Sequence, residues 1–249
     1  MTLNSLKSLY IVPKFNEINL ASATGFVVEK NNNKYLITNR HVVTGKNNIT
    51  NDNLDPTGAI PNKLLITVPI IHSNGASWTC IEINLYDTND KPLWLEHPIY
   101  KNNVDVVAIP LYNFNYNNLA YPVESTPYLE ITDTLFIIGY PYSYKVLPGD
   151  KRVAIWTMGT VASEPELNLN INNQQLPAFL VDAKTRSGQS GSPVIYYNNT
   201  GFIKNSSGFG IMGNPVSFEV GIYSGRINKD SDLGFVWKWS NISEIISQN

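Results

Sequence analysis

The sequence predicts an all-β protein built from antiparallel strands. Two observations carry this prediction: short runs rich in β-branched and aromatic residues recur along all 249 residues, and Asn, Gly, Pro or Asp stands between them. A third is that helical periodicity is scarce until the end of the chain. Many short strands separated by turn residues are typical of a barrel or a sandwich, so we expect one of these two architectures.

The predicted strands follow one another at short intervals. The polar tetrapeptide 30–33 joins the first two strands as a hairpin loop would. Segment 112–128, rich in Asn and with two prolines, lacks a clear period and is expected to connect two halves. A helix is expected within 237–246, where Ser and Asn offer caps and apolar residues recur at spacings of three and four. The predicted strands are 25–29, 34–38, 64–68, 81–85, 104–111, 134–138, 153–158, 179–182, 193–196 and 218–223.

Composition excludes several classes of function. A net charge of -2, with 15% charged residues and no run of Lys or Arg, gives no electrostatic basis for binding nucleic acid or an anionic membrane. The N-terminus lacks the apolar stretch of a secretory signal, and no apolar run approaches the length of a membrane-spanning helix. The single cysteine, Cys80, allows no internal disulfide and favours a reducing compartment. We therefore expect a cytoplasmic protein, or a secreted one if a signal peptide has been removed.

The histidines and acidic residues are not spaced to bind a metal. His72 lies in a predicted turn and His97 precedes a proline, so both are expected to be solvated loop residues, and their spacing matches no zinc pattern. The acidic cluster at Asp87 and Asp90 lacks the glycine and the terminal glutamate of a calcium-binding loop, and a solvated turn explains it better. No metal and no other cofactor is expected.

The segment SGQSGSP at 187–193 is the most informative motif of the chain. A serine hydroxyl is a weak nucleophile, so it needs a neighbouring base and hydrogen-bond donors for the developing oxyanion. Ser190 stands between two glycines, and Gly188 permits a backbone that points the N–H groups of Gly188 and Ser190 inward together. The alternative is a polar, flexible loop without function, because short motifs often match by chance.

Two further residues supply the partners that a serine nucleophile needs. His41 follows the predicted strand 34–38 and precedes a polar loop, which places its imidazole at a strand end. Asp105 opens a mainly apolar run, where a strand would carry it inward, and a buried carboxylate needs a partner such as an imidazole N–H. An aspartate that caps a turn is the alternative. The three signals gain weight together, because they occur in the order His, Asp, Ser in a chain with a suitable strand pattern.

Together these segments resemble the trypsin-like serine proteases, of the bacterial kind that includes the glutamyl endopeptidases and the protease domains of the HtrA family. The resemblance extends from about Gly25 to Trp237. The serine block is highly specific for this family, and the histidine block fairly so. The resemblance rests on TNRH at 38–41, DVVAIPL at 105–111, GYP at 139–141, DAKTRSGQSGSP at 182–193 and VGIYSG at 220–225.

The resemblance implies a chymotrypsin-like fold with two antiparallel six-stranded β-barrels and a C-terminal helix. Residues 1–115 would form the N-terminal barrel with the histidine and aspartate of the site, residues 116–236 the C-terminal barrel with the serine, and residues 237–249 the helix. The site would then lie in the cleft between the barrels.

The resemblance also implies a function and a set of site residues. His41, Asp105 and Ser190 would be the catalytic triad of a serine endopeptidase that works through an acyl-enzyme, and the amides of Gly188 and Ser190 would form the oxyanion hole. One strand edge would pair with the substrate backbone, and the segment before the nucleophile would line the pocket for the side chain that precedes the cleaved bond. The implied substrate-binding residues are Lys184, Thr185, Arg186, Ser187, Tyr223, Ser224, Gly225 and Arg226.

Gln189 departs from the pattern of the animal digestive members. Those proteins have an aspartate immediately before the nucleophile, and it pairs with the new N-terminus that zymogen cleavage creates. A neutral amide forms no such ion pair, so this mode of activation is excluded. We expect either constitutive activity or control by loops or partners.

Substrate preference and one competing function stay open. Lys184, Arg186 and Arg226 would favour an acidic substrate side chain through charge pairing, whereas long basic side chains usually point into water. No histidine falls where the glutamyl endopeptidases use one to bind their substrate. The competing function is a non-catalytic or partner-gated protein-binding effector that retains the fold. Expected partners are a protein or peptide substrate and a regulatory protein, with neither nucleic acid nor membrane.

Overall fold

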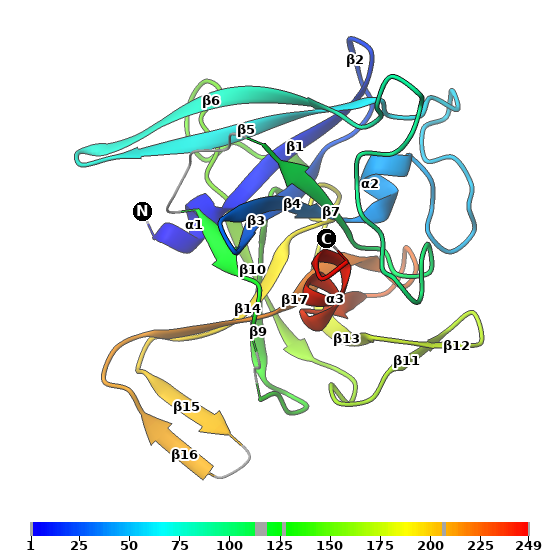
Figure 1. Cartoon of the computed structure of the whole chain (residues 1–249). Helices are drawn as coiled ribbons and strands as arrows, with labels where there is room; N and C mark the ends of the chain where they lie inside the picture. Colours follow the sequence, from blue (N-terminus) through cyan, green and yellow to red (C-terminus); the bar gives the residue numbers. More distant parts are fainter. Residues whose placement is uncertain (1, 113–118, 126–127, 206–207, 249) are drawn as a thin grey trace.

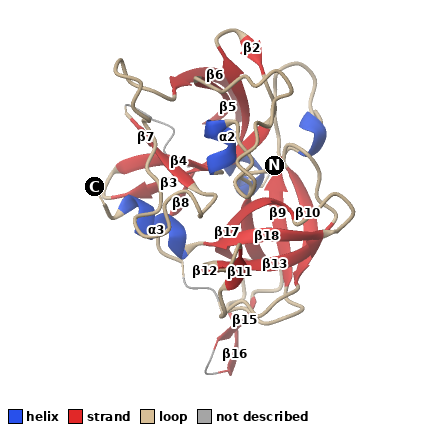
Figure 2. Cartoon of the chain, turned by 90° about the vertical axis from the view of Figure 1, so that its right-hand side faces the viewer, coloured by secondary structure: helices blue, strands red, loops and turns tan. Residues whose placement is uncertain are grey.

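A computed structural model describes residues 2–112, 119–125, 128–205 and 208–248 (Figure 1). The described chain is mostly strand, as the sequence predicts. Its strands separate into a sheet formed by the first half and a barrel formed by the second half (Figure 2).

The first half forms an eight-stranded sheet whose main path runs β6-β5-β1-β3-β4-β7. Strand β2 pairs with β1, and β8 pairs in parallel with β3. The sequence analysis did not predict β1, although it pairs with both β3 and β5. The strands are β1 (Ser8–Phe15), β2 (Ile18–Asn19), β3 (Ala23–Lys30), β4 (Asn33–Thr38), β5 (Lys63–His72), β6 (Gly75–Asn84), β7 (Val107–Leu111) and β8 (Ala120–Pro122).

The expected closure of this first sheet into a six-stranded barrel is not found in the described part of the chain. Strands β6 and β7 lie at the two ends of the path and do not pair with each other. The free edge of β7 is instead taken by Leu95, whose backbone exchanges two hydrogen bonds with Ala108, of 2.8 and 3.1 Å. The irregular segment between β6 and β7 therefore replaces the pairing that would close the barrel.

The second half forms a closed six-stranded barrel in the order β10-β13-β18-β17-β14-β9. Every neighbouring pair in this barrel is antiparallel. Two small hairpins, β11–β12 and β15–β16, extend from it (Figure 1). The strands are β9 (Thr134–Gly139), β10 (Ile155–Val161), β11 (Leu169–Ile171), β12 (Gln174–Leu176), β13 (Ala178–Ala183), β14 (Pro193–Asn198), β15 (Phe202–Asn205), β16 (Gly208–Ile211), β17 (Val216–Arg226) and β18 (Leu233–Lys238).

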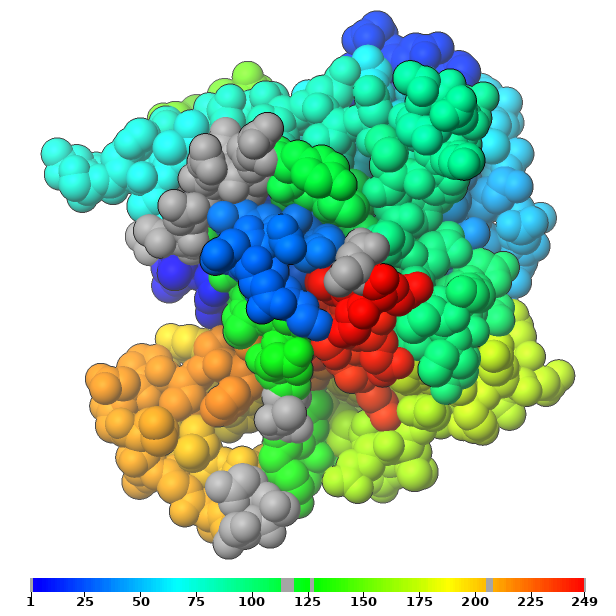
Figure 3. Space-filling view, in the orientation of Figure 1, coloured from blue at the N-terminus to red at the C-terminus, as the bar shows by residue number. Residues whose placement is uncertain are grey.

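Helices are short: α1 (Leu3–Lys7), α2 (Arg40–Thr44), the 3-10 turn η1 (Pro141–Ser143) and α3 (Ser240–Ile246). The C-terminal helix begins at Ser240 rather than at residue 237, because Trp237 and Lys238 complete β18 and pair with the neighbouring strands of the barrel. On the face shown in Figure 3, α3 lies against residues of the first half, and the Nζ of Lys30 donates to the Oγ of Ser247 at 2.8 Å. The helix thus bridges the two halves.

An apolar core joins the two halves beneath this helix. Phe26 and Tyr121 from the first half pack against Trp239 and Ile242 from the second. The rings of Phe26 and Trp239 stack with centroids 5.3 Å apart, and the Trp239 Nε1 donates to the carbonyl oxygen of Val123 at 2.9 Å. Interiors packed in this way resist displacement, so the core fixes the first half relative to the second.

The expected division of the chain at residue 115 lies outside the described residues, and the domain boundaries stay a prediction. Across the described ranges, no helix is long and apolar enough to cross a membrane.

Candidate active site

Ser190 lies in the turn between β13 and β14, and two glycines shape this turn. Gly188 and Gly191 have φ angles of +94° and +83°, in the region that glycine adopts most readily. A Cβ on Gly188 would lie 2.3 Å from the carbonyl oxygen of Tyr140, and one on Gly191 would lie 2.1 Å from that of Thr24. Both positions therefore require glycine, for backbone conformation and for close approach.

Gln189 holds the same turn from inside the barrel. Its side chain is 0% exposed. Its Oε1 accepts a hydrogen bond from the backbone N–H of Arg186 at 2.7 Å, and its Nε2 donates to the Oγ1 of Thr157 at 2.8 Å. Because Thr157 belongs to β10, the amide ties the turn to the barrel wall.

The N–H groups of Gly188 and Ser190 are the two donors that the sequence analysis assigned to an oxyanion hole. Neither donates to any residue that the structure describes. The intervening and following N–H groups are all engaged, since those of Gln189, Gly191 and Ser192 donate to backbone carbonyls at 3.2, 2.9 and 3.0 Å. The turn therefore leaves two donors, one on each side of Gln189, for an acceptor from outside the chain.

His41 lies in α2, which follows β4 directly. The sequence analysis expected this residue at a strand end, whereas the structure places it in the first turn of a short helix. The preceding Asn39 is fully buried, and its Nδ2 donates to the backbone carbonyl of Asp105 at 2.7 Å. This bond ties the start of α2 to the segment that precedes β7.

Asp105 is the buried partner of His41. The residue is 2% exposed and lies two positions before β7, which begins at Val107 rather than at residue 104. Its Oδ1 accepts a hydrogen bond from the backbone N–H of His41 at 2.8 Å, and its Oδ2 lies 2.7 Å from the Nδ1 of His41. The same Oδ2 also accepts a hydrogen bond from the Oγ of Ser224. The carboxylate thus has three donors, as a buried charge requires.

The environment of His41 sets its tautomer and its pKa. Burial lowers the pKa of His41, but the charge of Asp105 and its hydrogen bond to the imidazole raise that pKa, and the net effect is a pKa above the ordinary value. When His41 is neutral, the bond to Asp105 keeps the proton on Nδ1. The Nε2 is then the nitrogen that can accept a proton.

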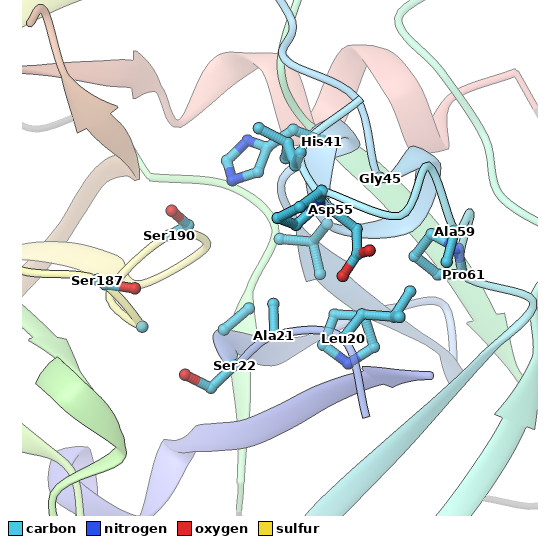
Figure 4. A pocket seen from close by; sticks show the side chains of 16 residues that line it. Leu20, Ala21, Ser22, His41, Gly45, Asp55, Ala59, Pro61, Ser187 and Ser190 are labelled. Carbon is cyan, nitrogen blue, oxygen red and sulfur yellow. The ribbon is translucent and has the colours of Figure 1, made fainter. Parts of the chain in front are cut away.

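Ser190 and His41 line the same cavity, from the second and first halves respectively (Figure 4). The Oγ of Ser190 donates to the backbone carbonyl of Ser224 at 3.0 Å, and among the described residues no hydrogen bond joins it to His41. Ser224 therefore contacts two predicted triad members: its hydroxyl binds Asp105 and its carbonyl accepts from Ser190.

The sequence predicts neither of these contacts, because the resemblance places Ser224 only on the strand edge that would bind substrate. The structural reason is a bulge, since the pairing of β17 with β18 shifts register between Tyr223 and Gly225. A bulge re-aims the side chain at its position. No spacing in the sequence marks it.

The other residues implied for substrate binding separate into buried and exposed groups. Thr185 and Tyr223 are buried, and their hydroxyls form a hydrogen bond with each other. The ring of Tyr223 lies over Gly234, where a Cβ would come within 2.5 Å of the ring. Lys184 and Ser187 are exposed, and Gly225 is half-buried.

The two implied arginines bind backbone carbonyls. The Nη1 of Arg186 donates to the carbonyl oxygen of Thr185 at 2.7 Å, and the Nη1 of Arg226 donates to that of Lys229 at 2.8 Å. Each guanidinium keeps further donors, so charge pairing with a substrate is compatible with these contacts.

The two remaining histidines lie away from this site. His72 is exposed and its Nε2 lies 2.8 Å from the Oγ of Ser77. His97 is fully buried, so the expectation that it is solvated is wrong: its Nδ1 accepts two backbone N–H groups, and its Nε2 lies 3.1 Å from Glu244 of α3. Within the described ranges, no group of three or more His, Cys, Asp or Glu residues is arranged to hold a metal ion.

A closed β-barrel is joined to a second sheet, and His41, paired with Asp105, lines one cavity with Ser190 from the barrel; this arrangement is that of a chymotrypsin-like protein. The family model described as the trypsin-like peptidase domain matches residues 23–202. The chain therefore belongs to the trypsin-like peptidase family, whose members are serine proteases.

Solved structures with the same fold are distant in sequence. The serine endoprotease from Yersinia pestis is 15% identical with a TM-score of 0.56, over 100% of this chain and 66% of that chain. The active form of the Rv3671c protease from M. tuberculosis is 17% identical with a TM-score of 0.52, over 98% and 81%. Deg5 is 16% identical with a TM-score of 0.51, over 96% and 86%. These similarities support the fold.

Proposed function

We propose that this protein is a serine endopeptidase that cleaves peptide bonds through an acyl-enzyme on Ser190. Two observations carry the proposal: Asp105 binds both the backbone N–H and the Nδ1 of His41, and His41 lines one cavity together with Ser190. A nucleophile, a base and a group that orients the base are the elements of a catalytic triad.

Ser190, His41 and Gly188 take part directly in the proposed reaction. Ser190 rotates its hydroxyl from the Ser224 carbonyl toward His41, and its Oγ attacks the substrate carbonyl carbon while the Nε2 of His41 takes the proton. The oxyanion receives hydrogen bonds from the N–H groups of Gly188 and Ser190. Collapse breaks the C–N bond, and the leaving amine takes the proton from His41. Water, activated by the same Nε2, then releases the acid and restores Ser190.

Asp105 does not give up its charge during this cycle. It holds the Nδ1–H of His41 and stabilises the imidazolium that forms when Ser190 loses its proton. Asn39 and Ser224 keep the aspartate and its segment in place through the bonds described above.

The acyl half of the substrate is proposed to lie along Ser224, Gly225 and Arg226 at the edge of β17, as an added β-strand. Its side chain before the cleaved bond would face the wall formed by residues 184–187. The carbonyl of Ser224 accepts the Ser190 hydroxyl in the free protein, so rotation of Ser190 also frees this carbonyl for a substrate N–H.

The proposal is tested with a fluorophosphonate probe, which reacts with an activated serine. We expect labelling of the wild type and none of Ser190→Ala, together with cleavage of a peptide library by the wild type alone. Gly188 and Gln189 are left intact in this variant, so the turn is preserved. Absence of Ser190-dependent labelling under every condition tried would refute the proposed hydrolase.

One observation favours a second candidate, a partner-gated or non-catalytic effector. In the free protein, Ser190 is bonded to Ser224 and not to His41. If a partner protein is needed to turn the serine, labelling would be slow in the isolated protein and would rise on addition of that partner. Fast labelling of the isolated protein would exclude this candidate.

A further inference from the structure

A cavity of about 230 Å³ opens beside His41 and Ser190 (Figure 4). In the figure, Ser187 and Ser190 lie on one side of it, and Asp55, Ala59 and Pro61 lie on the other. The walls come from the turn that precedes β3 and from the loop between α2 and β5. The cavity is smaller than the roughly 300–1,000 Å³ of pockets that enclose drug-sized ligands, and suits a single side chain.

The walls of this cavity are mainly apolar. The contributing apolar side chains include Leu20, Ala21, Val42, Leu54, Ala59 and Pro61. Leu54 remains 51% exposed at the edge, so part of its apolar surface faces water in the free protein. An apolar side chain that entered would remove this surface and its own from water, which is favourable.

The only ionisable side chains among the lining residues are those of His41, at the reacting end, and Asp55. The Oδ1 of Asp55 accepts hydrogen bonds from the N–H and the Oγ1 of Thr57, at 2.9 and 2.6 Å. The side-chain and backbone bonds from Thr57 lower the pKa of Asp55, so its carboxyl is ionised at neutral pH. A second carboxylate in this cavity would be repelled.

The position of the cavity shows which half of a substrate it faces. The acyl half is proposed to lie along β17, toward Ser224, which accepts the Ser190 hydroxyl. No residue of β17 or β18 lines the cavity, and residues 182–186 do not line it either. An extended substrate that passes Ser190 therefore directs its leaving half toward this cavity.

We infer that the cavity binds an apolar side chain on the amine side of the cleaved bond and disfavours an acidic one there. This inference rests on the proposed endopeptidase function. It adds a substrate class: peptides with a leucine-sized apolar residue soon after the cleaved bond.

The test uses acyl transfer. An activated ester acylates Ser190, and the acyl-enzyme then reacts either with water or with an added amine. In the second reaction the amine nitrogen attacks the acyl carbonyl, and the Oγ of Ser190 leaves and recovers its proton through His41. The ratio of amide to acid is measured with leucine amide, glycine amide and aspartic acid α-amide at equal concentrations. We expect about tenfold or more amide from leucine than from glycine, as filling an apolar pocket produces, and less from aspartate than from glycine.

Failure of the inference and failure of the proposed function differ in this experiment. Equal ratios for leucine and glycine amides, with the ester still consumed by the wild type and not by Ser190→Ala, would overturn the inference alone. No Ser190-dependent consumption of the ester would overturn the proposed function.

Two variants and a matched control locate the binding site. Leu54→Ala is expected to reduce the leucine-to-glycine ratio several-fold, and Ala21→Asp is expected to reduce it further by placing a charge in the apolar wall. Leu93→Ala removes a leucine of similar exposure, 42%, that does not line the cavity, and should keep the wild-type ratio. Because each ratio compares two fates of one acyl-enzyme, a slower acylation does not change it. Wild-type ratios in both cavity variants would show that the amine binds elsewhere.

Discussion

Removal of the Gln189 side chain should loosen the turn that carries Ser190. In Gln189→Ala, the N–H of Arg186 and the hydroxyl of Thr157 both lose their partner, at 2.7 and 2.8 Å. A hydrogen bond contributes about 0.5–1.5 kcal/mol net, so two contribute about 1–3 kcal/mol. The side chain is 0% exposed, and the space it leaves adds to the loss.

We therefore expect Gln189→Ala to lower the free energy of unfolding by about 2–4 kcal/mol, which corresponds to roughly 4–16 °C in the thermal midpoint for a chain of this size. Activity should fall as well, because the N–H groups of Gly188 and Ser190 flank the loosened residue. A misplaced oxyanion hole affects the transition state more than substrate binding, so kcat should fall by about tenfold or more with a smaller change in KM.

Urea unfolding and ester hydrolysis measure the two effects. Gln175→Ala, which removes an exposed glutamine from β12, is the matched control and should match the wild type in both assays. The reasoning would be refuted by a Gln189→Ala protein that unfolds within about 0.5 kcal/mol of the wild type and keeps its kcat. A protein destabilised without loss of kcat would show that Gln189 supports the barrel but does not position the oxyanion hole.

Four further predictions concern the same site. Asp105→Asn should reduce kcat/KM by about 10⁴-fold, the loss found for this substitution in the trypsin triad. The reason is that an amide NH₂ facing Nδ1 favours the wrong tautomer of His41. A loss below tenfold would contradict the role proposed for Asp105. Activity should fall as pH decreases through the raised pKa of His41, with a midpoint above the ordinary value of about 6.5, since the neutral imidazole is the base. In Asp105→Asn the residual activity should show a lower midpoint, because burial, which lowers the pKa of His41, is then no longer opposed by the charge of Asp105. The His41–Asp105 pair should also stabilise the fold most below about pH 6.5, and this contribution should be lost as pH rises through the raised pKa of His41. Urea unfolding at several pH values measures the free energy of unfolding and tests this prediction. Gly188→Ala should abolish fluorophosphonate labelling and lower the thermal midpoint by several degrees. The φ of +94° at this position is unfavourable for alanine, and the alanine Cβ would lie 2.3 Å from the carbonyl oxygen of Tyr140. Normal labelling would show that the turn can relax.

The sequence predicts the chemistry of the site better than its scaffold. Asp105 could be assigned a partner because a carboxylate at an apolar run is costly to bury alone, and the structure brings it to His41. The unusual backbone expected at Gly188 is also present, with a φ of +94°. Both arguments depend on local chemistry, which the residue types express directly.

Features that depend on distant pairing were harder to predict. The role of Ser224 follows from a bulge between two strands, and the open first sheet follows from Leu95 taking the edge of β7. Strand β1 was missed, although it lies between β3 and β5, because its hydrophobic run begins next to α1 and contains a proline. Each of these pairings depends on which segments compete for one strand edge. The residues of a single segment do not show which competitor wins.

The core shared by the two halves also governs when this site is assembled. Trp239 and α3 come after Ser190 in the chain, yet they pack against Phe26 and Tyr121, which come before it. During translation, a ribosome therefore releases His41, Asp105 and Ser190 before it releases the last residues of this shared core. A nascent chain that ends between Ser190 and Trp239 would carry the proposed nucleophile and base without this core, so we expect the proposed activity only after the C-terminal helix has been made.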